Sequence, residues 1–342
     1  MRIANSGNHV GRSLRRSGFK SAIAWLSMLA LGASGAAAAQ DGESAAPVQP
    51  RPAEIMSRAD QSLLLDVTFT GKHFVAVGER GDILVSNDGK AWAQVQVPVR
   101  APLTAVQFVN DEQGWAVGHD AVILHTEDGG RTWSLQNFEP ELEQPFLDLY
   151  FLDAQRGYAV GAYGMMVGTD DAGLSWEPVD APAIRDEELH FNSITQLADG
   201  TLFIAGESTM MGFSRDHGET WTRFESPYDG TLFGALPFGE HGVLVYGMRG
   251  NVLYTKDLSE GLEGWTALDT QTVASFFGGT RLPGGGYALV GLNGQILELQ
   301  EDGQIAARES TGRADSLAAV TPIGDGLLLV GTAGTARLSL NK

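Results

Sequence analysis

The chain contains seven copies of one short pattern, and this repeat restricts the fold more than any other feature of the sequence. An apolar run that ends in glycine recurs at intervals of 40 to 45 residues. The seven glycines are Gly78, Gly118, Gly161, Gly206, Gly247, Gly291 and Gly331. A period of this length is typical of stacked units, each of which buries its apolar faces only against its neighbours.

Each copy reads as several short strands with tight turns between them. The first copy has the runs LLLDVTF at residues 63–69 and GDILVSN at 81–87, and the later copies have equivalent runs. Wholly apolar or alternating runs bounded by Gly, Asp and Asn predict strands, and no helical periodicity interrupts them. Seven units of four antiparallel strands predict an all-β protein, a seven-bladed β-propeller over residues 54–342.

The last copy is shorter than the others. It reaches only GLLLVGTAGTARLSLN at 326–341, so it has no fourth strand of its own. The segment EIMSRADQS at 54–62 precedes the first copy. Because a propeller must close, this N-terminal segment is expected to supply the missing outer strand and to fasten the ring.

The first 39 residues have the layout of a cleavable export signal peptide. Basic residues precede the apolar run AIAWLSMLALGASGAAAA at 22–39, which ends in small residues. Residues 40–53 are rich in proline and polar residues and predict a flexible linker. The expected location is the periplasm. The general secretory route is favoured over twin-arginine export, and an uncleaved anchor stays open.

The charge and the lack of cysteine exclude several classes of function. Loss of the leader would leave 18 basic against 42 acidic residues, and such a field repels nucleic acids and anionic lipid surfaces. The sequence has no cysteine, so neither a disulfide nor a lipoprotein attachment site is expected. Its seven histidines lack the spacing of metal ligands, and no phosphate-binding loop precedes a helix. No metal or other cofactor is therefore predicted.

A small acidic turn that ends in tryptophan recurs in the first four copies. The stretches are SNDGKAW at 86–92, TEDGGRTW at 126–133, TDDAGLSW at 169–176 and SRDHGETW at 214–221. An aspartate in such a turn can accept backbone N–H bonds, and the tryptophan can pack between blades. An active site needs only one or two acids, so acids repeated around a ring are expected to be structural, and no catalytic residue is assigned. The predicted structural residues are Asp88, Trp92, Asp128, Trp133, Asp171, Trp176, Asp216 and Trp221.

The motif Ser/Thr-x-Asp-x-Gly-x-Thr/Ser-Trp is the Asp-box, or bacterial neuraminidase (BNR) repeat. Together with GWAVG at 114–118 and GYAVG at 157–161, it makes residues 55–342 resemble the photosystem II stability and assembly-factor propellers. The resemblance implies a non-enzymatic binding scaffold that holds a membrane-protein subunit or precursor during assembly. In a photosynthetic host the expected location would be the thylakoid lumen. Asp-boxes are specific for the fold but not for the function, because sialidases and sortilin-type receptors carry them too.

Strand alternation places the turns between second and third strands, together with the links between blades, on one face of the ring. The side chains expected there, and expected to bind the partner, are Arg80, Arg249, Arg100, Arg185, Arg313, Glu79, His119, Tyr163 and Glu207. Guanidinium groups suit carboxylates and peptides through forked hydrogen bonds, and the resemblance implies an arginine-rich binding patch. The alternative is that these arginines only pair with nearby acids.

Two other classes of function stay open. In a sialidase-like glycoside hydrolase, Tyr163 and Glu207 could meet across adjacent blades, but only Arg58 stands where an Arg-Ile-Pro type motif would be. In a receptor, a small polar molecule would bind in the central channel. Direct membrane insertion of the mature protein is not expected, and the protein is expected to be monomeric.

Overall fold

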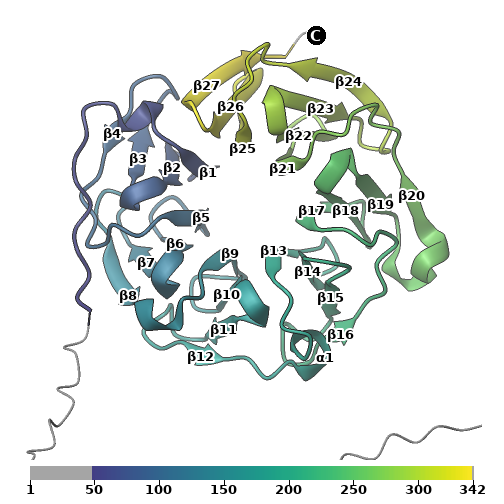
Figure 1. Cartoon of the computed structure of the whole chain (residues 1–342), viewed down its shortest axis with the longest axis horizontal. Coiled ribbons are helices and arrows are strands. Elements are labelled where there is room, and N and C mark those ends of the chain that lie inside the picture. Colours follow the sequence, from purple (N-terminus) through teal and green to yellow (C-terminus); the bar gives the residue numbers. More distant parts are fainter. Residues whose placement is uncertain (1–47, 341–342) are drawn as a thin grey trace, which may run out of the picture. The chain divides into compact units, whose positions relative to one another are not determined.

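The computed structural model describes residues 48–340, so the predicted export signal and residues 40–47 of the predicted linker lie outside the described part. Seven antiparallel sheets are arranged around a central opening (Figure 1). Within each sheet the strands follow one another in sequence order from the opening to the rim. The predicted seven-bladed β-propeller is confirmed.

The first strand of every blade lies within one of the predicted apolar runs and lines the opening. Blade 1 contains β1 (Leu64–Phe69), β2 (Phe74–Gly78), β3 (Ile83–Ser86) and β4 (Ala93–Gln94). Blade 2 contains β5 (Leu103–Phe108), β6 (Gly114–Gly118), β7 (Ile123–Thr126) and β8 (Ser134–Asn137). Blade 3 contains β9 (Phe146–Phe151), β10 (Gly157–Gly161), β11 (Met166–Thr169) and β12 (Glu177–Pro178).

The remaining blades continue the same order. Blade 4 contains β13 (Phe191–Gln196), β14 (Leu202–Gly206), β15 (Met211–Ser214) and β16 (Thr222–Arg223). Blade 5 contains β17 (Leu232–Phe238), β18 (Gly242–Gly247), β19 (Val252–Thr255) and β20 (Trp265–Ala267). Blade 6 contains β21 (Phe276–Arg281), β22 (Tyr287–Gly291), β23 (Gln295–Leu299) and β24 (Ile305–Ser310). Blade 7 contains β25 (Leu317–Ile323), β26 (Gly326–Gly331) and β27 (Gly334–Ser339).

All but one of the described helical turns lie in connections between strands. Five short 3-10 turns join second to third strands: η2 (Glu79–Gly81), η3 (His119–Ala121), η5 (Ala162–Gly164), η6 (Met248–Gly250) and η8 (Leu292–Gly294). The others are η1 (Ala59–Gln61) before β1, η4 (Pro140–Leu142), α1 (Pro182–Arg185) and η7 (Leu258–Gly264).

Close packing explains why glycine ends the second strand of every blade. The backbone there is extended, with φ at −179° for Gly118, so an unusual dihedral angle is not the reason. A Cβ atom on Gly118 would lie 2.0 Å from the carbonyl oxygen of Pro102, and one on Gly161 would lie 2.1 Å from that of Pro145. The first strand bulges at the same point, and it presses its backbone against the glycine. Any side chain would push these two strands apart.

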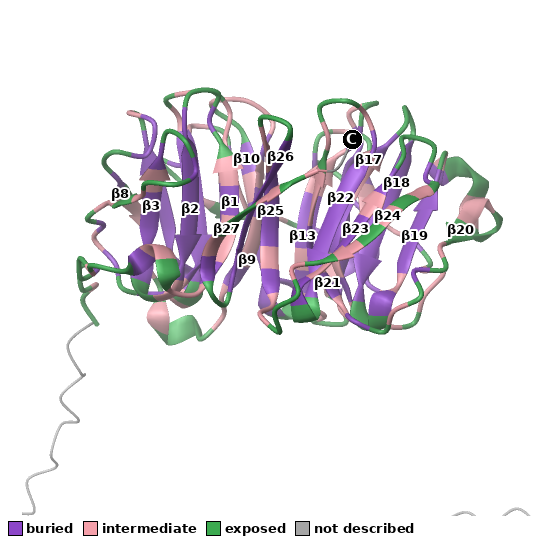
Figure 2. Ribbon diagram, turned by 90° about the horizontal axis from the view of Figure 1, so that it is seen from above, coloured by how far each residue is buried: buried purple, intermediate pink, exposed green. Residues whose placement is uncertain are grey.

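The core consists of apolar layers between adjacent blades. The second strand of each blade is almost wholly buried, whereas most of the connections are exposed or half-buried (Figure 2). Between blades 1 and 2, for example, Val75 and Val77 pack with Val106 and Leu124. Burial of one such side chain stabilises the fold by about 1.5–3 kcal/mol. Because each blade is covered only by its neighbours, the apolar pattern has to recur in every unit.

The N-terminal segment does not close the ring as an outer strand, so this detail of the prediction is wrong. Residues 54–62 form no strand, and blade 7 has three strands among residues 48–340. The side chain of Gln94 holds the segment along blade 1 instead, accepting from the Met56 N–H at 2.6 Å and donating to the Glu54 carbonyl at 3.0 Å. η1 contacts β27 of blade 7, where the Asp60 carbonyl lies against Gly334.

Side-chain packing between blades 7 and 1 closes the ring within the described residues. Leu328 and Val330 of β26 share one core cluster with Phe74 and Ala76 of β2. This interface has the same character as those between the other blades. It therefore supplies the apolar burial that closure needs without a shared sheet.

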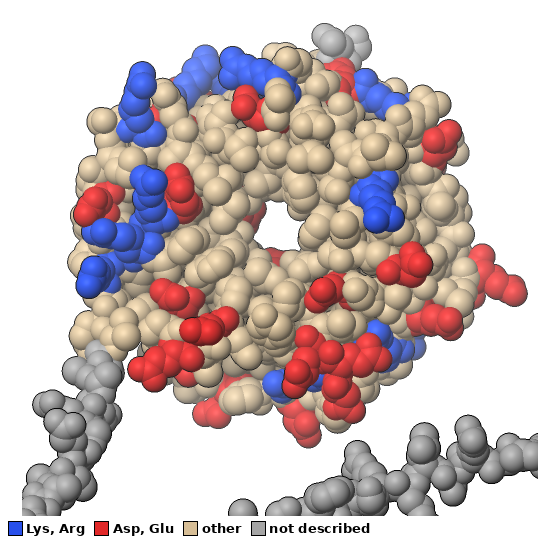
Figure 3. Space-filling model, in the orientation of Figure 1, with Lys and Arg blue, Asp and Glu red and all other residues tan. Residues whose placement is uncertain are grey.

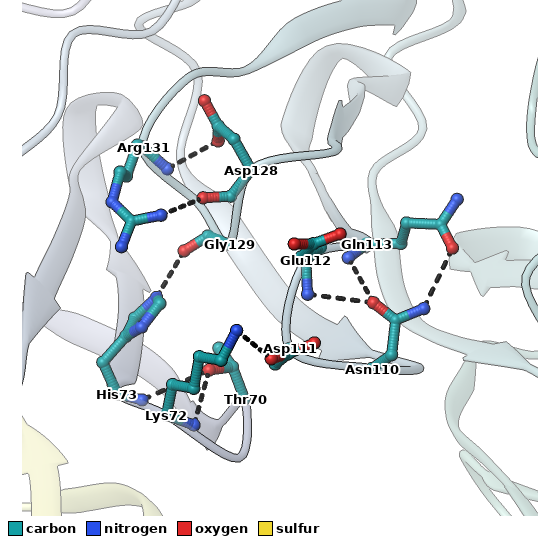
Figure 4. Close-up of polar contacts among 10 residues, drawn as sticks. All are labelled: Thr70, Lys72, His73, Asn110, Asp111, Glu112, Gln113, Asp128, Gly129 and Arg131. Atoms are coloured by element: carbon teal, nitrogen blue, oxygen red, sulfur yellow. Dashed lines mark hydrogen bonds and ion pairs between the residues drawn. The ribbon is translucent and has the colours of Figure 1, made fainter.

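The Asp-box aspartates bond to their own turns. Asp128 Oδ1 accepts the backbone N–H group of Arg131 at 2.9 Å (Figure 4). It also accepts the Thr132 N–H at 2.9 Å, and Oδ2 accepts the Thr132 hydroxyl at 2.6 Å. The Trp133 indole N–H donates to the Gly130 carbonyl at 3.0 Å. The same turn also anchors the neighbouring blade, because His73 Nε2 lies 2.5 Å from the Gly129 carbonyl oxygen (Figure 4).

Candidate partner-binding face

The turns between second and third strands and the links between blades form one surface of the disc, which we call the 2–3 face. The Asp-box turns and the turns between first and second strands form the opposite surface, the Asp-box face. Figure 2 shows the short helical turns gathered along one edge of the disc, which is the 2–3 face. All nine residues predicted to bind a partner belong to turns or links of this face.

A left-handed residue stands at the tip of each of the five 3-10 turns on the 2–3 face. In η2 the turn is closed by a bond from the Asp82 N–H to the Glu79 carbonyl at 3.0 Å, and the equivalent bond closes the other four. The tip residues are Arg80 (φ 60°), Asp120 (φ 58°), Tyr163 (φ 55°), Arg249 (φ 56°) and Asn293 (φ 58°). Asparagine and aspartate tolerate this conformation, whereas arginine and tyrosine are held there at a cost of about 1–2 kcal/mol. Residues held in a strained backbone conformation of this kind often mark binding sites.

Arg80 and Arg100 both contact the N-terminal segment as it crosses blade 1. Arg100 Nη2 lies 2.5 Å from Glu54 Oε1, and Arg80 Nη1 lies 3.7 Å from the sulfur of Met56. Arg80 also faces Glu79, with Nε and Oε2 3.9 Å apart. The side chain of Arg80 is 59% exposed and that of Arg100 is 45% exposed. We call Arg80 and Arg100 the blade 1 arginine pair.

The other three predicted arginines lie apart from this pair. Arg185 has an internal role, because its guanidinium donates to the Gly164 carbonyl at 2.8 Å and to the Val179 carbonyl at 2.6 Å. Arg249 lines an open groove of about 650 Å³ on blade 5. Arg313 lines a groove on blade 7. The five arginines are thus distributed around the ring and do not form one cluster.

His190 contacts both Tyr163 and Glu207, and it was not a candidate site residue from the sequence. The rings of Tyr163 and His190 are edge to face with centroids 4.8 Å apart, and His190 Nδ1 lies 3.5 Å from Glu207 Oε2. All three side chains are partly exposed, at the boundary of blades 3 and 4. His119 is on the neighbouring turn η3, where its backbone N–H donates to the Pro102 carbonyl at 2.9 Å.

Charge is unevenly distributed on the 2–3 face. Figure 3 shows basic side chains over blades 6, 7 and 1, whereas acidic side chains gather over blades 2 to 4. The acidic residues in the links and turns of those blades include Glu139, Glu141, Glu143, Asp186, Glu187, Glu188 and Glu207. A partner with carboxylates would therefore be attracted to one side of this face and repelled from the other.

Two aspartates line the central channel, and neither was a candidate from the sequence. Asp66 Oδ2 accepts the backbone N–H of Val106 at 2.9 Å, and Asp148 Oδ2 accepts that of Ile194 at 2.9 Å. Each carboxylate thus connects its own blade to the next one. Burial raises the pKa of Asp66 to about 6 and that of Asp148 to about 7. The channel has a volume of about 310 Å³.

Alignment of the repeats would have revealed these aspartates. Both follow the bulge of the first strand, at one register position of the repeat. The residues at that position around the ring are Asp66, Ala105, Asp148, Ser193, Gly234, Gly278 and Ala319. Five of these seven residues are small and uncharged, and two are aspartates. The aspartates therefore stand out in the aligned repeats as candidates for a function in the channel.

Metal-binding groups of side chains and membrane-spanning helices are both absent from residues 48–340. No group of three or more His, Asp or Glu side chains is arranged to hold a metal ion in this part of the chain. None of the helices described here is both long and apolar enough to span a membrane.

Comparison with known proteins identifies the family. The family model described as photosynthesis system II assembly factor YCF48 matches residues 48–143 and 134–321. The photosystem II assembly protein Ycf48 of Thermosynechococcus vestitus is 37% identical over 46 residues, which are 14% of this chain and 13% of that protein. The chloroplastic photosystem II stability/assembly factor HCF136 of Cyanidioschyzon merolae is 40% identical over 53 residues, 15% of this chain and 12% of the relative. The alignments thus span only a small part of either relative.

Solved structures agree on the fold. A structure described as YCF48 bound to D1 peptide superposes with a TM-score of 0.65 at 18% identity, over 82% of this chain and 94% of that one. YCF48 from Cyanidioschyzon merolae gives a TM-score of 0.65 at 17% identity, over 85% and 98% of the two chains. The WD40 domain of Sif2 also superposes, with a TM-score of 0.60 at 9% identity over 86% of this chain and 100% of that one, so the shape alone does not separate families. The family model does, and the chain belongs to the photosynthesis system II assembly factor YCF48 family.

Proposed function

We propose that this protein is an exported, non-enzymatic assembly factor that holds a segment of a membrane-protein subunit or precursor on its 2–3 face. Membership of the YCF48 family is the observation that carries this proposal. A related structure is described as bound to a D1 peptide, which supports a peptide-like client for this chain as well. The predicted leader supports export to the periplasm or thylakoid lumen.

The blade 1 arginine pair is the proposed anchor for a carboxylate of the client. Arg80 and Arg100 are both accessible, and Glu54 is the residue that now pairs with Arg100. The Glu54 side chain is 73% exposed, and an ion pair between exposed groups contributes only about 0–1 kcal/mol. A client carboxylate can therefore replace Glu54 at little cost and gain forked hydrogen bonds.

The acidic links of blades 2 to 4 would orient the client. A segment with carboxylates at one end and neutral or basic residues at the other would lie across the face with its acidic end at blade 1. Such complementarity mainly affects the association rate and the specificity, and it weakens with added salt.

An in-cell cross-linking experiment tests the proposal. The tagged chain is compared with Arg80→Glu/Arg100→Glu, after circular dichroism has shown that the variant is folded. Lys256→Glu/Arg281→Glu is the matched control, because it makes the same charge change on the Asp-box face. The proposal expects one membrane protein to be captured by the native chain and by the control, and at least tenfold less of it by the arginine variant.

Two outcomes would contradict parts of the proposal. Equal capture by all three forms would remove the blade 1 arginine pair as the anchor while keeping the assembly role. Capture of no membrane protein by the native chain would remove the assembly role itself.

The two alternative functions have less support. A small-ligand receptor would use the channel carboxylates, but Asp66 and Asp148 already accept backbone N–H groups with both oxygens. A sialidase-like enzyme would need Tyr163 beside Glu207, and His190 contacts both of them. Cleavage of a fluorogenic sialoside by the pure protein, lost in Glu207→Ala, would support the enzyme instead.

A further inference from the structure

Among residues 48–340, no strand pairs with the outer edge of blade 7. In the other blades, a backbone carbonyl near the start of the third strand accepts an N–H from the outer segment. Examples are the bonds from Val95 to Ile83 at 2.8 Å and from Leu268 to Val252 at 2.9 Å. The equivalent residue of blade 7 is Thr335, which faces Val330 as Ile83 faces Val77. No residue in the range 48–340 donates a backbone bond to it.

The free backbone groups of this edge follow from the register. N–H and C=O groups point to alternate sides along a strand, so the outward residues of β27 are Thr335, Arg337 and Ser339. Arg337 and Ser339 are exposed. A groove of about 420 Å³ runs beside the strand and is lined by residues that include Arg313, Asp315 and Leu338. The edge therefore has backbone N–H and C=O groups that no described residue pairs with, and it has room for another strand.

The side chains around the edge define what would fit. Outer segments of other blades place an aliphatic residue against the core, as Val95 and Leu268 do. On blade 7 the half-buried Leu338 and Leu340 offer the matching apolar surface. Arg313 and Arg337 have no carboxylate partner among the described residues, and Arg337 donates only to the Asp88 carbonyl, at 3.4 Å. An incoming strand that alternates aliphatic and acidic residues would satisfy both kinds of surface.

A second copy of the chain fits this edge poorly. Antiparallel pairing of two β27 strands centred on the open edge would bring the Arg337 side chains of both copies close together. Like charges opposite or diagonal to each other destabilise a strand pair. The charge of the edge thus favours a different, acidic strand.

We propose that the outer edge of β27 binds an extended segment of a partner chain, in which aliphatic residues alternate with Asp or Glu, as the fourth strand of blade 7. Main-chain hydrogen bonds would supply the affinity, and the alternate side chains would supply the specificity. This site lies on the rim at β27 and is separate from the blade 1 arginine pair, so it goes beyond the function proposed above.

Peptide binding tests the proposal on the full chain. The probe is fluorescently labelled acetyl-Thr-Val-Glu-Val-Glu-Val-Thr-amide, and binding is followed by fluorescence anisotropy. One control peptide carries N-methyl groups on alternate amides, and another has Lys in place of Glu. Both controls are expected to bind at least tenfold more weakly than the probe. Equal binding of the probe and the N-methylated peptide, or no saturable binding of the probe up to 1 mM peptide (about 4 kcal/mol of affinity), would overturn the proposal.

Two variants of one residue separate the backbone from the charge. Arg337→Pro removes an outward N–H without removing a bond to β26, because proline is tolerated on edge strands. Arg337→Ala keeps the N–H and removes the guanidinium. We expect at least tenfold weaker binding of the glutamate probe by the folded Arg337→Pro protein, and a loss of roughly threefold in Arg337→Ala. Unchanged binding in Arg337→Pro would contradict strand addition.

Hydrogen exchange identifies the occupant without any substitution. The amides of Arg337 and Ser339 should exchange quickly in the chain alone and at least tenfold more slowly with the probe bound. Slow exchange in the chain alone, at concentrations where sedimentation shows a monomer, would mean that the chain's own residues cover the edge. Slow exchange that appears only with a concentration-dependent dimer would mean that a second copy covers it. Either result would overturn the proposal of a partner strand.

Discussion

The two faces of the disc come from the same repeat but use it differently. On the Asp-box face, Asp88, Asp128, Asp171 and Asp216 each accept backbone N–H groups of their own turn, so side chain and backbone repeat together. On the 2–3 face, the left-handed backbone of the turn tip repeats but the side chain changes from Arg to Asp, Tyr or Asn.

This difference indicates where the sequence is free to carry function. A side chain that satisfies its own turn cannot change without loss of the hydrogen bonds that stabilise the turn, so the Asp-box face is committed to the fold. A side chain at the tip of a turn closed by backbone bonds can change at small cost. The 2–3 face can therefore carry the binding residues.

The largest effect is expected from the Asp-box tryptophan of blade 2. Trp133 is 8% exposed, and its indole N–H is bonded to the Gly130 carbonyl. Trp133→Ala should lower the free energy of unfolding by about 3–5 kcal/mol, through a cavity between blades 1 and 2. Urea unfolding followed by circular dichroism measures this. A loss below about 1 kcal/mol would mean that the tryptophan does not hold the blades together.

The next largest effect is expected in the pH dependence of the free energy of unfolding, to which Asp148 and Asp216 contribute through pKa shifts in opposite directions. Burial raises the pKa of Asp148 to about 7, whereas hydrogen bonds from Thr220 and Ser214 lower that of Asp216 to about 2. A raised folded pKa stabilises the fold below the unfolded value of 3.8, and this stability is lost as the pH rises through about 7. The free energy of unfolding should therefore fall by about 3 kcal/mol between pH 4 and pH 8 on account of Asp148.

Two substitutions check the pH dependence by urea unfolding at several pH values. Asp148→Asn cannot titrate, so its stability should change less between pH 4 and pH 8 than that of the native chain. Asp216→Asn should leave the change in stability between pH 4 and pH 8 as it is in the native chain. It should alter the pH dependence only below about pH 4, where Asp216 titrates because its pKa is lowered. Parallel curves for the native chain and Asp148→Asn would rule out the channel carboxylate as the cause.

A smaller loss is expected when an Asp-box aspartate is truncated. Asp128 accepts two backbone N–H groups and two hydroxyl groups in one turn. Asp128→Ala should cost about 0.5–2 kcal/mol, as for other side chains that cap backbone donors. Thermal unfolding is the measurement. An unchanged midpoint would mean that water replaces the aspartate without loss.

The smallest effect is expected on the 2–3 face. Arg249 and Asn293 occupy the same left-handed position in blades 5 and 6. Arg249→Asn should stabilise the fold by up to about 1 kcal/mol, because asparagine adopts this conformation more readily, and Asn293→Arg should destabilise it by a similar amount. Changes of the same sign in both variants would show that the side-chain environment, and not the backbone angle, decides stability there.

The parts of the protein that repeat were predictable. The seven blades, the strand runs and the Asp-box turns recur along the chain, and repetition made weak local signals add up. The placement of Arg185 was not predictable in the same way, because its bonds to Gly164 and Val179 depend on the fold of one particular link. Asp66 and Asp148 were not predicted because one aspartate in one apolar run does not show which surface it faces, and only alignment of the first strands of all seven blades does.

The sequence by itself determined the repeat, the number of blades, the acidic Asp-box turns and the family resemblance, since these depend on local patterns of apolar residues, glycines and turns. Only the tertiary structure decided how the ring closes. Residues 54–62 lie along blade 1 and do not pair with blade 7, because Gln94 bonds to Met56 and Glu54. These residues are 38 and 40 positions away from Gln94 in the chain. Such contacts between distant segments are set by packing of the whole ring, which no local pattern records.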